Sequence, residues 1–555
     1  MKAKKILALL LAILLIAAVA ACGGGGGDDT AGGGGGSTPS GGGSSTPSGG
    51  GSSTPSGSGP SHGDTNDPGF ASTSGRDTLT IAVTRDLGTL SPAHLMGSDY
   101  NQVMRNVQEP VWSVMFDGEI IMILATHYEE VTPTQWTIHL RDDVYFSNGS
   151  KFTAHDWVFS LGVWRDAGVS GAGRIQNLNI DATKAINDYT IELHWDNYRW
   201  DHVNTIADLL VYDSKTYTPE QASGNPIGTG PYVVTDYVIN SHVFMERRDD
   251  YWGELPDIKY MNFRVLAETS QRVNALETGM VDIAPIAAYD AAYVESLPGL
   301  TVRDRIAGLW IHVGLNPTPG RTLNNVEARY AIAAAIDKQP ISDLIYYGKA
   351  NVMNGPASVA CHDWLPKYEN GHETYTIGYN LDRAKELANR SGLAGKELLL
   401  ITNGTPEHVS IAEMIQNMLS QINVTVVIHN YDAAGFQAAS REPDQWDMTI
   451  AQGFVPTLNY GGALTNFMRY NAVFNVPGSW ESAEWFVEYA PNVFFIDDPV
   501  ARRVVIDEAF ERYVTGCLYY SICEFLTSEA MAEDITGPFR QNLDGTPVWK
   551  MLKFN

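Results

Sequence analysis

The chain is 555 residues long, and its 64 acidic and 37 basic residues give it a formal net charge of −27 at pH 7. Such a chain repels phosphate backbones and anionic headgroups, so nucleic-acid binding is excluded. Four cysteines are too few for a disulfide scaffold and wrongly spaced for a zinc knuckle, although one pair among Cys361, Cys517 and Cys523 can still form.

The N-terminus has the three parts of an export signal. Lysines at positions 2, 4 and 5 precede the apolar run Ile6–Val19, and small residues follow it. The run is too short to span a bilayer comfortably, so residues 1–21 are predicted to be a cleaved signal peptide. The sequence Val19-Ala20-Ala21-Cys22 resembles a bacterial lipobox, which predicts lipidation of Cys22 and an anchor of two acyl chains. The alternative is an ordinary signal peptide cleaved near Ala21.

A low-complexity segment follows Cys22. Residues 23 to about 67 are almost entirely Gly, Ser, Thr, Pro and Asp, and the run Gly-Gly-Gly-Ser-Ser-Thr-Pro-Ser occurs at 41–48 and again at 49–56. Such a composition has nothing to bury, so residues 22–76 are expected to form a disordered tether. As a flexible coil it would span roughly 35 to 40 Å and lift the folded part off the membrane.

The folded part, from about Thr78 to Asn555, shows strand patterns first and helical patterns later. The segments before residue 270 that predict strands are Thr78–Val83, Gln135–Leu140, Tyr189–Leu193 and Tyr232–Val238. The spacing of Arg329, Ala333 and Ile336 then predicts a helix over 326–337. Asn380 is a good N-cap for a further helix.

Residues 398–428 have the pattern of a βαβ unit. Leu398–Ile401 is a short apolar run, apolar residues recur at helical spacing from Ile411 to Ile422, and Val424–Ile428 is a β-branched run. This pattern predicts two parallel strands with a right-handed crossover. At this length about three domains are expected. The strand and helix patterns together predict a large α/β protein with parallel sheet in its second half.

Several conspicuous glycines and carboxylates have structural explanations. Gly228 and Gly230 flank a threonine just before Pro231, which predicts a tight turn that needs positive φ or close backbone approach. No Gly-Lys-Ser/Thr follows, so a phosphate-binding loop is not expected. Asp156 and Asp337 can be read as catalytic carboxylates or as residues that cap and brace helices, and we favour the second reading.

A series of short motifs extends along nearly the whole folded part. They are residues 79–83 (Leu-Thr-Ile-Ala-Val), 89–92 (Thr-Leu-Ser-Pro), 140–149, 153–156 (Thr-Ala-His-Asp), 228–232 (Gly-Thr-Gly-Pro-Tyr), 246–247, 250–253 (Asp-Tyr-Trp-Gly), 335–337 (Ala-Ile-Asp) and 379–380 (Tyr-Asn). In order and spacing they resemble the family 5 extracellular solute-binding proteins of ABC importers, which include oligopeptide-, dipeptide- and nickel-binding proteins. Asp143 and Trp157 depart from the glycine and valine usual in that family.

The resemblance implies a class II periplasmic-binding-protein-like fold of the large, three-subdomain type. Two lobes would enclose a cleft and be joined by crossover strands near 309–316 and 519–525. The implied boundaries are 77–120, 222–309 and 524–555 for lobe I, 121–221 for its extra subdomain, and 310–523 for lobe II. Hinge closure would bury a ligand that enters the open cleft. The permease and ATPase subunits are expected to be separate partners.

The identity of the ligand depends on one segment of the second lobe. Peptide-binding relatives carry an aspartate shortly after a Gly-Trp pair, and it holds the peptide amino terminus. Here Phe454 replaces the tryptophan, and the aspartate position falls on Pro456 or Thr457, neither of which can be an anion. Loss of that anchor should cost a peptide amine about 1.5 to 3 kcal/mol. The residues predicted to face the ligand, although the aromatic ones can equally be core, are Leu90, Met96, Tyr100, Trp112, Trp310, His312, Asn316, Phe454, Val455, Pro456, Thr457, Asn459 and Tyr460.

We expect no metal site, no cofactor and no catalysis. The tripeptide Cys361-His362-Asp363 combines three ligand types, but adjacent residues of an extended chain point to opposite sides. The folded part contains no Gly-x-Ser-x-Gly and no His-Glu-x-x-His motif, so a hydrolase is not indicated.

These observations predict a monomeric receptor outside the cytoplasm, anchored by lipid at the outer face of the cell membrane. It would capture oligopeptides, or a related oligomeric nutrient, and deliver them to an ABC importer. The alternatives are a ligand-sensing surface receptor and a binding protein for an oligosaccharide or a nickel chelate.

Overall fold

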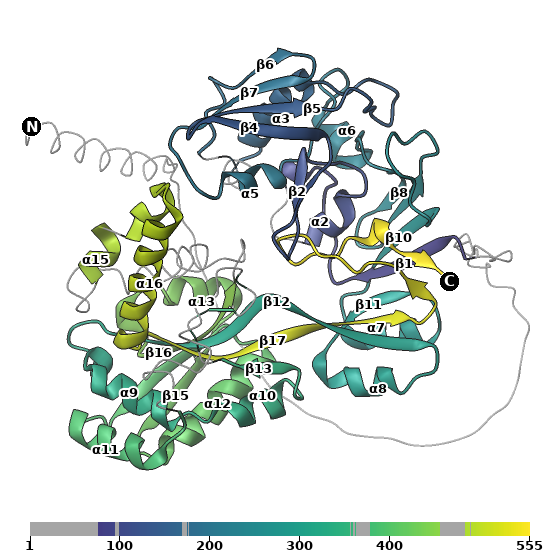
Figure 1. Cartoon of the computed structure of the whole chain (residues 1–555). Coiled ribbons are helices and arrows are strands. Elements are labelled where there is room, and N and C mark those ends of the chain that lie inside the picture. Colours follow the sequence, from purple (N-terminus) through teal and green to yellow (C-terminus); the bar gives the residue numbers. More distant parts are fainter. Residues whose placement is uncertain are drawn as a thin grey trace, which may run out of the picture. The chain divides into compact units, whose positions relative to one another are not determined.

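The computed structural model describes residues 76–94, 99–168, 175, 177–353, 355, 357–358, 361, 378–454, 483–488 and 490–555 (Figure 1). The predicted signal peptide, Cys22 and the predicted tether up to residue 75 lie outside them. The chain divides into two units, Met1–Phe70 and Ala71–Asn555, and all the described residues belong to the second.

The largest sheet in the described part of the chain has 11 strands, in the order β15-β14-β16-β12-β17-β11-β1-β10-β9-β8, with β13 paired to β17. Its strands are β1 (Thr78–Val83), β8 (Tyr232–Val238), β9 (His242–Arg247), β10 (Tyr260–Val265), β11 (Ile283–Ile286), β12 (Leu300–Leu315), β13 (Ala350–Val352), β14 (Glu397–Thr402), β15 (Thr425–Asn430), β16 (Met448–Phe454) and β17 (Tyr519–Ala532). The predicted βαβ unit is confirmed, because β14 and β15 are parallel neighbours connected through α12 (Pro406–Ser420).

The two longest strands, β12 and β17, pair antiparallel with each other from Leu300 and Ala532 to Gly314 and Tyr519 (Figure 1). The pairing shifts register between Ile306 and Trp310. β12 contains residues 309–315 of the predicted crossover segment 309–316, and β17 contains the whole of the segment 519–525.

The described residues also form smaller sheets that are separate from the 11-stranded sheet. An antiparallel sheet in the order β4-β5-β7-β6 consists of β4 (Ala125–Thr132), β5 (Gln135–Leu140), β7 (Thr190–His194) and β6 (Lys184–Asn187). Two-stranded sheets pair β2 (Trp112–Val114) with β3 (Ile120–Met122) and β18 (Ile535–Thr536) with β19 (Lys553–Phe554). The four-stranded sheet falls within the range predicted for the extra subdomain.

The remaining helices are α2 (Asp99–Met104), α3 (Ala154–Asp166), α5 (His202–Ala207), α6 (Pro219–Gly224), α7 (Thr269–Glu277), α8 (Ala291–Glu295), α9 (Val326–Ala335), α10 (Lys338–Ile345), α11 (Leu381–Ser391), α13 (Ala433–Ala439), α15 (Ala483–Glu488) and α16 (Pro499–Gly516). Short 3-10 helices cover Pro92–His94, Ala288–Asp290, Thr322–Asn324, Pro443–Gln445, Ala490–Phe495 and Trp549–Met551. Among the described residues, no helix combines the length and the apolar character needed to cross a membrane.

Polar side chains at helix starts have the roles predicted for them. Asn380 caps α11 by accepting a hydrogen bond from the backbone N–H of Arg383 at 2.9 Å. Asp337 caps α10. Asp156 is fully buried and accepts hydrogen bonds from Thr153 at the start of α3 and from Ser214. These contacts satisfy the carboxylate of Asp156 within the fold, so it braces a helix.

Buried apolar side chains form two large cores. All members of one come from residues 310–523. The other combines residues 79–263 with Ile283 and with the C-terminal residues Met531, Ile535, Trp549 and Leu552. A third, smaller cluster packs around α7, α8 and β11. The domain boundaries deduced from the sequence stay a prediction.

Two of the cysteines are inert by position. Cys517 and Cys523 are buried free thiols, and burial raises the pKa of each to about 12. A thiol with such a pKa is protonated at neutral pH and reacts slowly with oxidants.

The turn at Gly228 and Gly230 is explained by close approach and not by positive φ. A Cβ added to Gly230 would lie 2.5 Å from the carbonyl oxygen of Asn106 and 2.8 Å from the carbonyl carbon of Val107, and one added to Gly228 would lie closer still. The backbone N–H of Gly230 donates to Val107 at 2.9 Å, which holds the two chain segments together. Neither glycine has positive φ.

Gly230→Val should therefore destabilise the core formed mainly by residues 79–263 by about 1 to 3 kcal/mol, because the side chain collides with the backbone of Asn106 and Val107. Chemical denaturation would measure the change. Gly162→Ala in α3 is the matched control, since an added Cβ there meets nothing within 4 Å. Equal stability of the two variants would show that the close approach is unimportant.

Candidate functional site

A cavity of about 230 Å³ lies beside the long strands β12 and β17. Residues of β1, β11, β12, β17 and the C-terminal segment 544–549 form most of its wall. The lining residues are Ile81, Ala82, Val83, Thr84, Gln102, Ile283, Pro285, Arg305, Ala307, Leu309, Thr527, Glu529, Asp544, Gly545, Thr546, Pro547 and Trp549. The cavity adjoins the stretch of β12 that precedes the 310–523 core.

Two charged side chains in the cavity wall are paired with each other. Arg305 donates to Glu529 at 3.1 Å and to the carbonyl oxygen of Gly545 at 2.5 Å. Their side chains are only 23% and 13% exposed. Because Arg305 and Glu529 are paired, neither is left as an unpaired buried charge when a polar molecule enters the cavity. The third charged residue of the wall, Asp544, is held by hydrogen bonds from Asn101 and Thr546.

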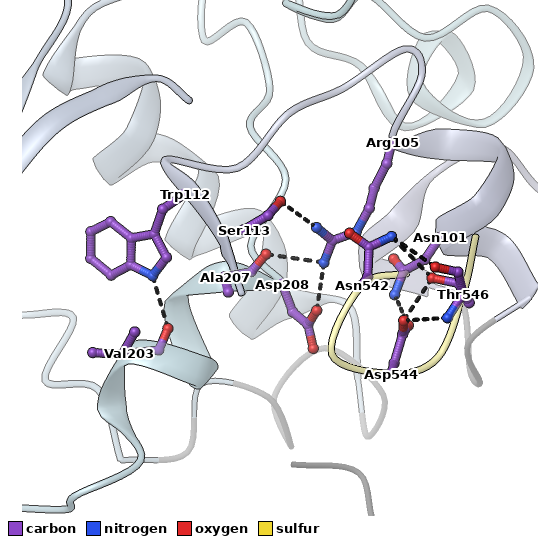
Figure 2. Close-up of polar contacts among 10 residues, drawn as sticks. All are labelled: Asn101, Arg105, Trp112, Ser113, Val203, Ala207, Asp208, Asn542, Asp544 and Thr546. Carbon is purple, nitrogen blue, oxygen red and sulfur yellow. Dashed lines mark hydrogen bonds and ion pairs between the residues drawn. The ribbon is translucent and has the colours of Figure 1, made fainter. Parts of the chain in front are cut away.

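Polar contacts fix the C-terminal part of the wall to α2 (Figure 2). The carboxylate of Asp544 accepts from the side chain of Asn101 at 2.5 Å, and from the hydroxyl and backbone N–H of Thr546 at 2.6 and 3.1 Å. Asn542 donates to the Thr546 hydroxyl at 3.1 Å. These contacts close residues 542–546 into a turn that forms one side of the cavity.

Arg105 and Trp112 tie α2, β2 and α5 together (Figure 2). Arg105 donates to the hydroxyl of Ser113 at 2.9 Å and to the carboxylate of Asp208 at 2.7 Å. The indole N–H of Trp112 donates to the carbonyl oxygen of Val203 at 2.9 Å. The indole N–H of Trp112 therefore has its hydrogen-bond partner within the protein.

The described members of the predicted ligand-facing set are all buried. Leu90, Tyr100, Trp112, Trp310 and Asn316 are at most 1% exposed, and His312 is 5% exposed. None of these six lines the cavity. Outside the described residues lie Met96, Val455, Pro456, Thr457, Asn459, Tyr460 and the side chain of Phe454. The ligand-facing set stays a prediction.

Asn316 connects the end of β12 to the start of β16. Its side-chain amide donates to the carbonyl oxygen of Trp446 at 2.8 Å, and its side-chain oxygen accepts from the backbone N–H of Thr318 at 3.0 Å. Its own N–H donates to the carbonyl oxygen of Asp447. Such a fully satisfied amide fixes the position of β16 against β12.

Trp310 explains the glycine that precedes Phe454. Trp310 and Gly453 are register partners on β12 and β16, and a Cβ on Gly453 would collide with the indole ring. Phe454 in turn pairs with Leu309, which lines the cavity. The backbone of the segment predicted to contact the ligand therefore begins at the edge of the cavity.

His312, in β12, is a buried imidazole against the ring of Tyr519, with ring centroids 4.9 Å apart. Burial, together with repulsion from His408, lowers the pKa of His312 from 6.5 to about 3. The imidazole is therefore neutral in the folded protein across the physiological range.

The sequence did not reveal Gln102, Arg305, Glu529 or Asp544. Each comes from a different segment, and no local motif marks any of them. The one available signal was the position of Arg305 just before a predicted crossover. The cavity could be found only once the strand order was known.

A mixed α/β fold with two large cores and two long paired strands, β12 and β17, is the class II periplasmic-binding-protein-like fold expected from the sequence. The ABC transporter substrate-binding protein CtaP of Listeria monocytogenes has a similar structure, with a TM-score of 0.75 and 18% identity over 86% of this chain and 99% of that one. This likeness confirms the fold class.

The sequence comparisons identify the family. The model for "Bacterial extracellular solute-binding proteins, family 5 Middle" matches residues 119–472. The nickel-binding periplasmic protein of Escherichia coli is 26% identical over 400 residues, covering 66% of this chain and 73% of that protein. The periplasmic oligopeptide-binding protein OppA of Escherichia coli is 22% identical over 454 residues, covering 74% and 80%.

The chain therefore belongs to the bacterial extracellular solute-binding proteins of family 5. Proteins of this family bind solutes and do not catalyse reactions, so the chain is a binding protein and not an enzyme.

The neutral imidazole of His312 makes stability depend on pH. The unfolded chain binds a proton near pH 6.5, whereas the folded protein resists protonation to about pH 3. Stability from this residue is therefore complete above pH 6.5 and is lost as the pH falls toward 3. Between pH 7 and 5 the wild type should lose about 2 kcal/mol more than His312→Phe, measured by urea denaturation. His155→Gln, at an exposed histidine, is the control and should lose as much stability as the wild type. If His312→Phe also lost as much stability as the wild type, His312 would not be the source of the pH dependence.

Proposed function

We propose that this protein is the receptor subunit of an ABC importer and that it works as a monomer outside the cytoplasm. Membership of the extracellular solute-binding family is the observation that carries the proposal. Its permease and ATPase partners would be separate chains. The lipobox-like residues before Cys22, and the Gly/Ser-rich segment after it, support a lipid anchor at the outer face of the membrane.

The hinge of this receptor is proposed to lie at Gly308 in β12. The pairing of β12 with β17 is interrupted between Ile306 and Trp310, and Gly308 within that interval has φ of 65°. Glycine absorbs changes of φ and ψ at low cost, so a bend is easiest there. A ligand that prefers the closed arrangement would shift the population toward it, and the permease can read that difference.

The cargo is proposed to be an oligopeptide or a related oligomeric nutrient. One relative is named for oligopeptides and another for nickel, so a nickel chelate is the main alternative. An oligosaccharide cargo and a purely sensing role are further alternatives. Because Pro456 and Thr457 cannot hold an ammonium group by charge, a peptide cargo would need another anchor for its amino terminus.

Native mass spectrometry tests the cargo directly. The protein from residue 22 onward, carrying Cys22→Ala, would be purified without denaturant, and the small molecules released on unfolding would be identified. A heterogeneous set of short peptides is the expected result. A saccharide, a metal chelate, or an empty protein that ignores a panel of peptides would end the peptide assignment while leaving the receptor assignment intact.

Removal of the anchor should separate location from binding. Cys22→Ala is expected to release or mislocalise the protein with ligand affinity unchanged, because the tether precedes the folded unit. Cell fractionation and calorimetry would measure the two effects. Ser44→Ala in the tether is the control and should stay membrane-bound. Weakened ligand binding by a soluble Cys22→Ala form would contradict the separation of tether and receptor.

A further inference from the structure

Three metal-ligating side chains meet on the four-stranded sheet, away from the residues that line the cavity. His127 and Glu129 lie on β4 and His139 lies on β5 (Figure 1 shows these two strands side by side). One ligand atom from each lies within 4.8 Å of the other two. Such a His/Glu/His group was found nowhere else in the described part of the chain.

The strand register brings these residues together. His127 and His139 are direct partners across the antiparallel β4–β5 ladder, and their rings stack with centroids 4.3 Å apart. Glu129 lies two residues after His127 and so projects from the same face of β4. Its carboxylate is 3.9 Å from His127 Nε2. No lysine or arginine of the described chain forms an ion pair with Glu129.

A bulge next to His127 supplies a second contact that orients the imidazole. The register shifts between Ala125 and His127, which leaves Thr126 as the extra residue of β4. The Thr126 hydroxyl donates its single proton to the carbonyl oxygen of His139 at 3.2 Å. Its oxygen is then left to accept from His127 Nδ1, 3.0 Å away. This arrangement favours the tautomer in which His127 Nε2 carries a free lone pair.

We propose that His127, Glu129 and His139 bind a divalent first-row transition-metal cation on the surface of the β4–β5 hairpin. Two imidazoles and one carboxylate are the donor set that such cations favour, and water would fill the remaining positions. The ligand atoms of tetrahedral zinc are about 3.3 Å apart, so the side chains need to close by about 1.5 Å at most. The side chains of His127 and Glu129 are 56% and 63% exposed, which leaves them free to make this adjustment.

The alternative is an exposed polar face of a sheet with no ligand. Two observations favour the cation. The stacked imidazoles bring nitrogen atoms of β4 and of the neighbouring β5 close together, and the Thr126 hydroxyl favours the tautomer of His127 in which Nε2 is free to bind a metal. The net charge of −27 also favours cations at the surface. We expected no metal site from the sequence, because a cross-strand pair cannot be seen without the register.

Zinc titration tests the proposal. The untagged protein from residue 22 onward with Cys22→Ala, freed of metal, would be titrated with Zn²⁺ by calorimetry. One Zn²⁺ per chain is expected, and His127→Gln or His139→Gln should weaken that binding at least tenfold. Thr126→Val should weaken it roughly tenfold, and Thr126→Ser, which keeps the hydroxyl, should restore it.

His155→Gln is the matched control, because His155 is also an exposed imidazole near a carboxylate but belongs to no such group. Melting temperatures without metal verify that each variant is folded. Zinc affinity that is the same in the wild type, His127→Gln and His139→Gln overturns the proposal. The cargo masses released by the His127→Gln variant should match those of the wild type, so that failure of this site and failure of the cargo assignment are distinguishable.

Discussion

The pairing of β12 with β17 is the constraint on which the rest of the structure depends. Both strands supply side chains to the 310–523 core, and β17 also supplies Met531 to the other large core. The members from the two strands in the first of these cores are Trp310, Ile311, Val313, Leu315, Tyr519, Tyr520, Ile522 and Cys523. A slip of one residue would turn every side chain of the ladder to the opposite face and disrupt both cores. The two register shifts of the ladder, one between Ile306 and Trp310 around Gly308 and one between Ile311 and His312, are each confined to a short interval with paired residues on both sides.

The C-terminal residues pack into the core formed mainly by residues 79–263. Glu109 is buried and accepts a hydrogen bond from Lys550 at 2.8 Å and another from Tyr251 at 2.9 Å. A buried carboxylate left without its lysine would be strongly destabilising, so this contact fixes where the last residues pack. The same packing of the C-terminal residues places Asp544 in the cavity wall. The cavity thus depends on contacts between segments more than 400 residues apart.

Local signals sufficed for much of the fold. Strands 78–83, 135–140 and 232–238 were predicted with the bounds that the structure has, and Asn380 does cap a helix. The turn at Gly228 and Gly230 was predicted to need either positive φ or close backbone approach, and the structure shows close backbone approach. The pair Arg305 and Glu529, and the pair His127 and His139, could not be predicted, because each depends on strand register that leaves no trace in either segment alone.

The position of Phe454 suggests how ligand binding and the strand break are coupled. The backbone of Phe454 pairs with Leu309, which follows Gly308 directly and lines the cavity. Trp310, the next residue along β12, covers Gly453, so β16 cannot slide without displacing a buried indole. A ligand held by the segment that starts at Phe454 would therefore act on β12 within the interval where its pairing with β17 is interrupted. If the proposed hinge lies at Gly308, binding energy spent there would bias it directly, without a longer chain of contacts to transmit it.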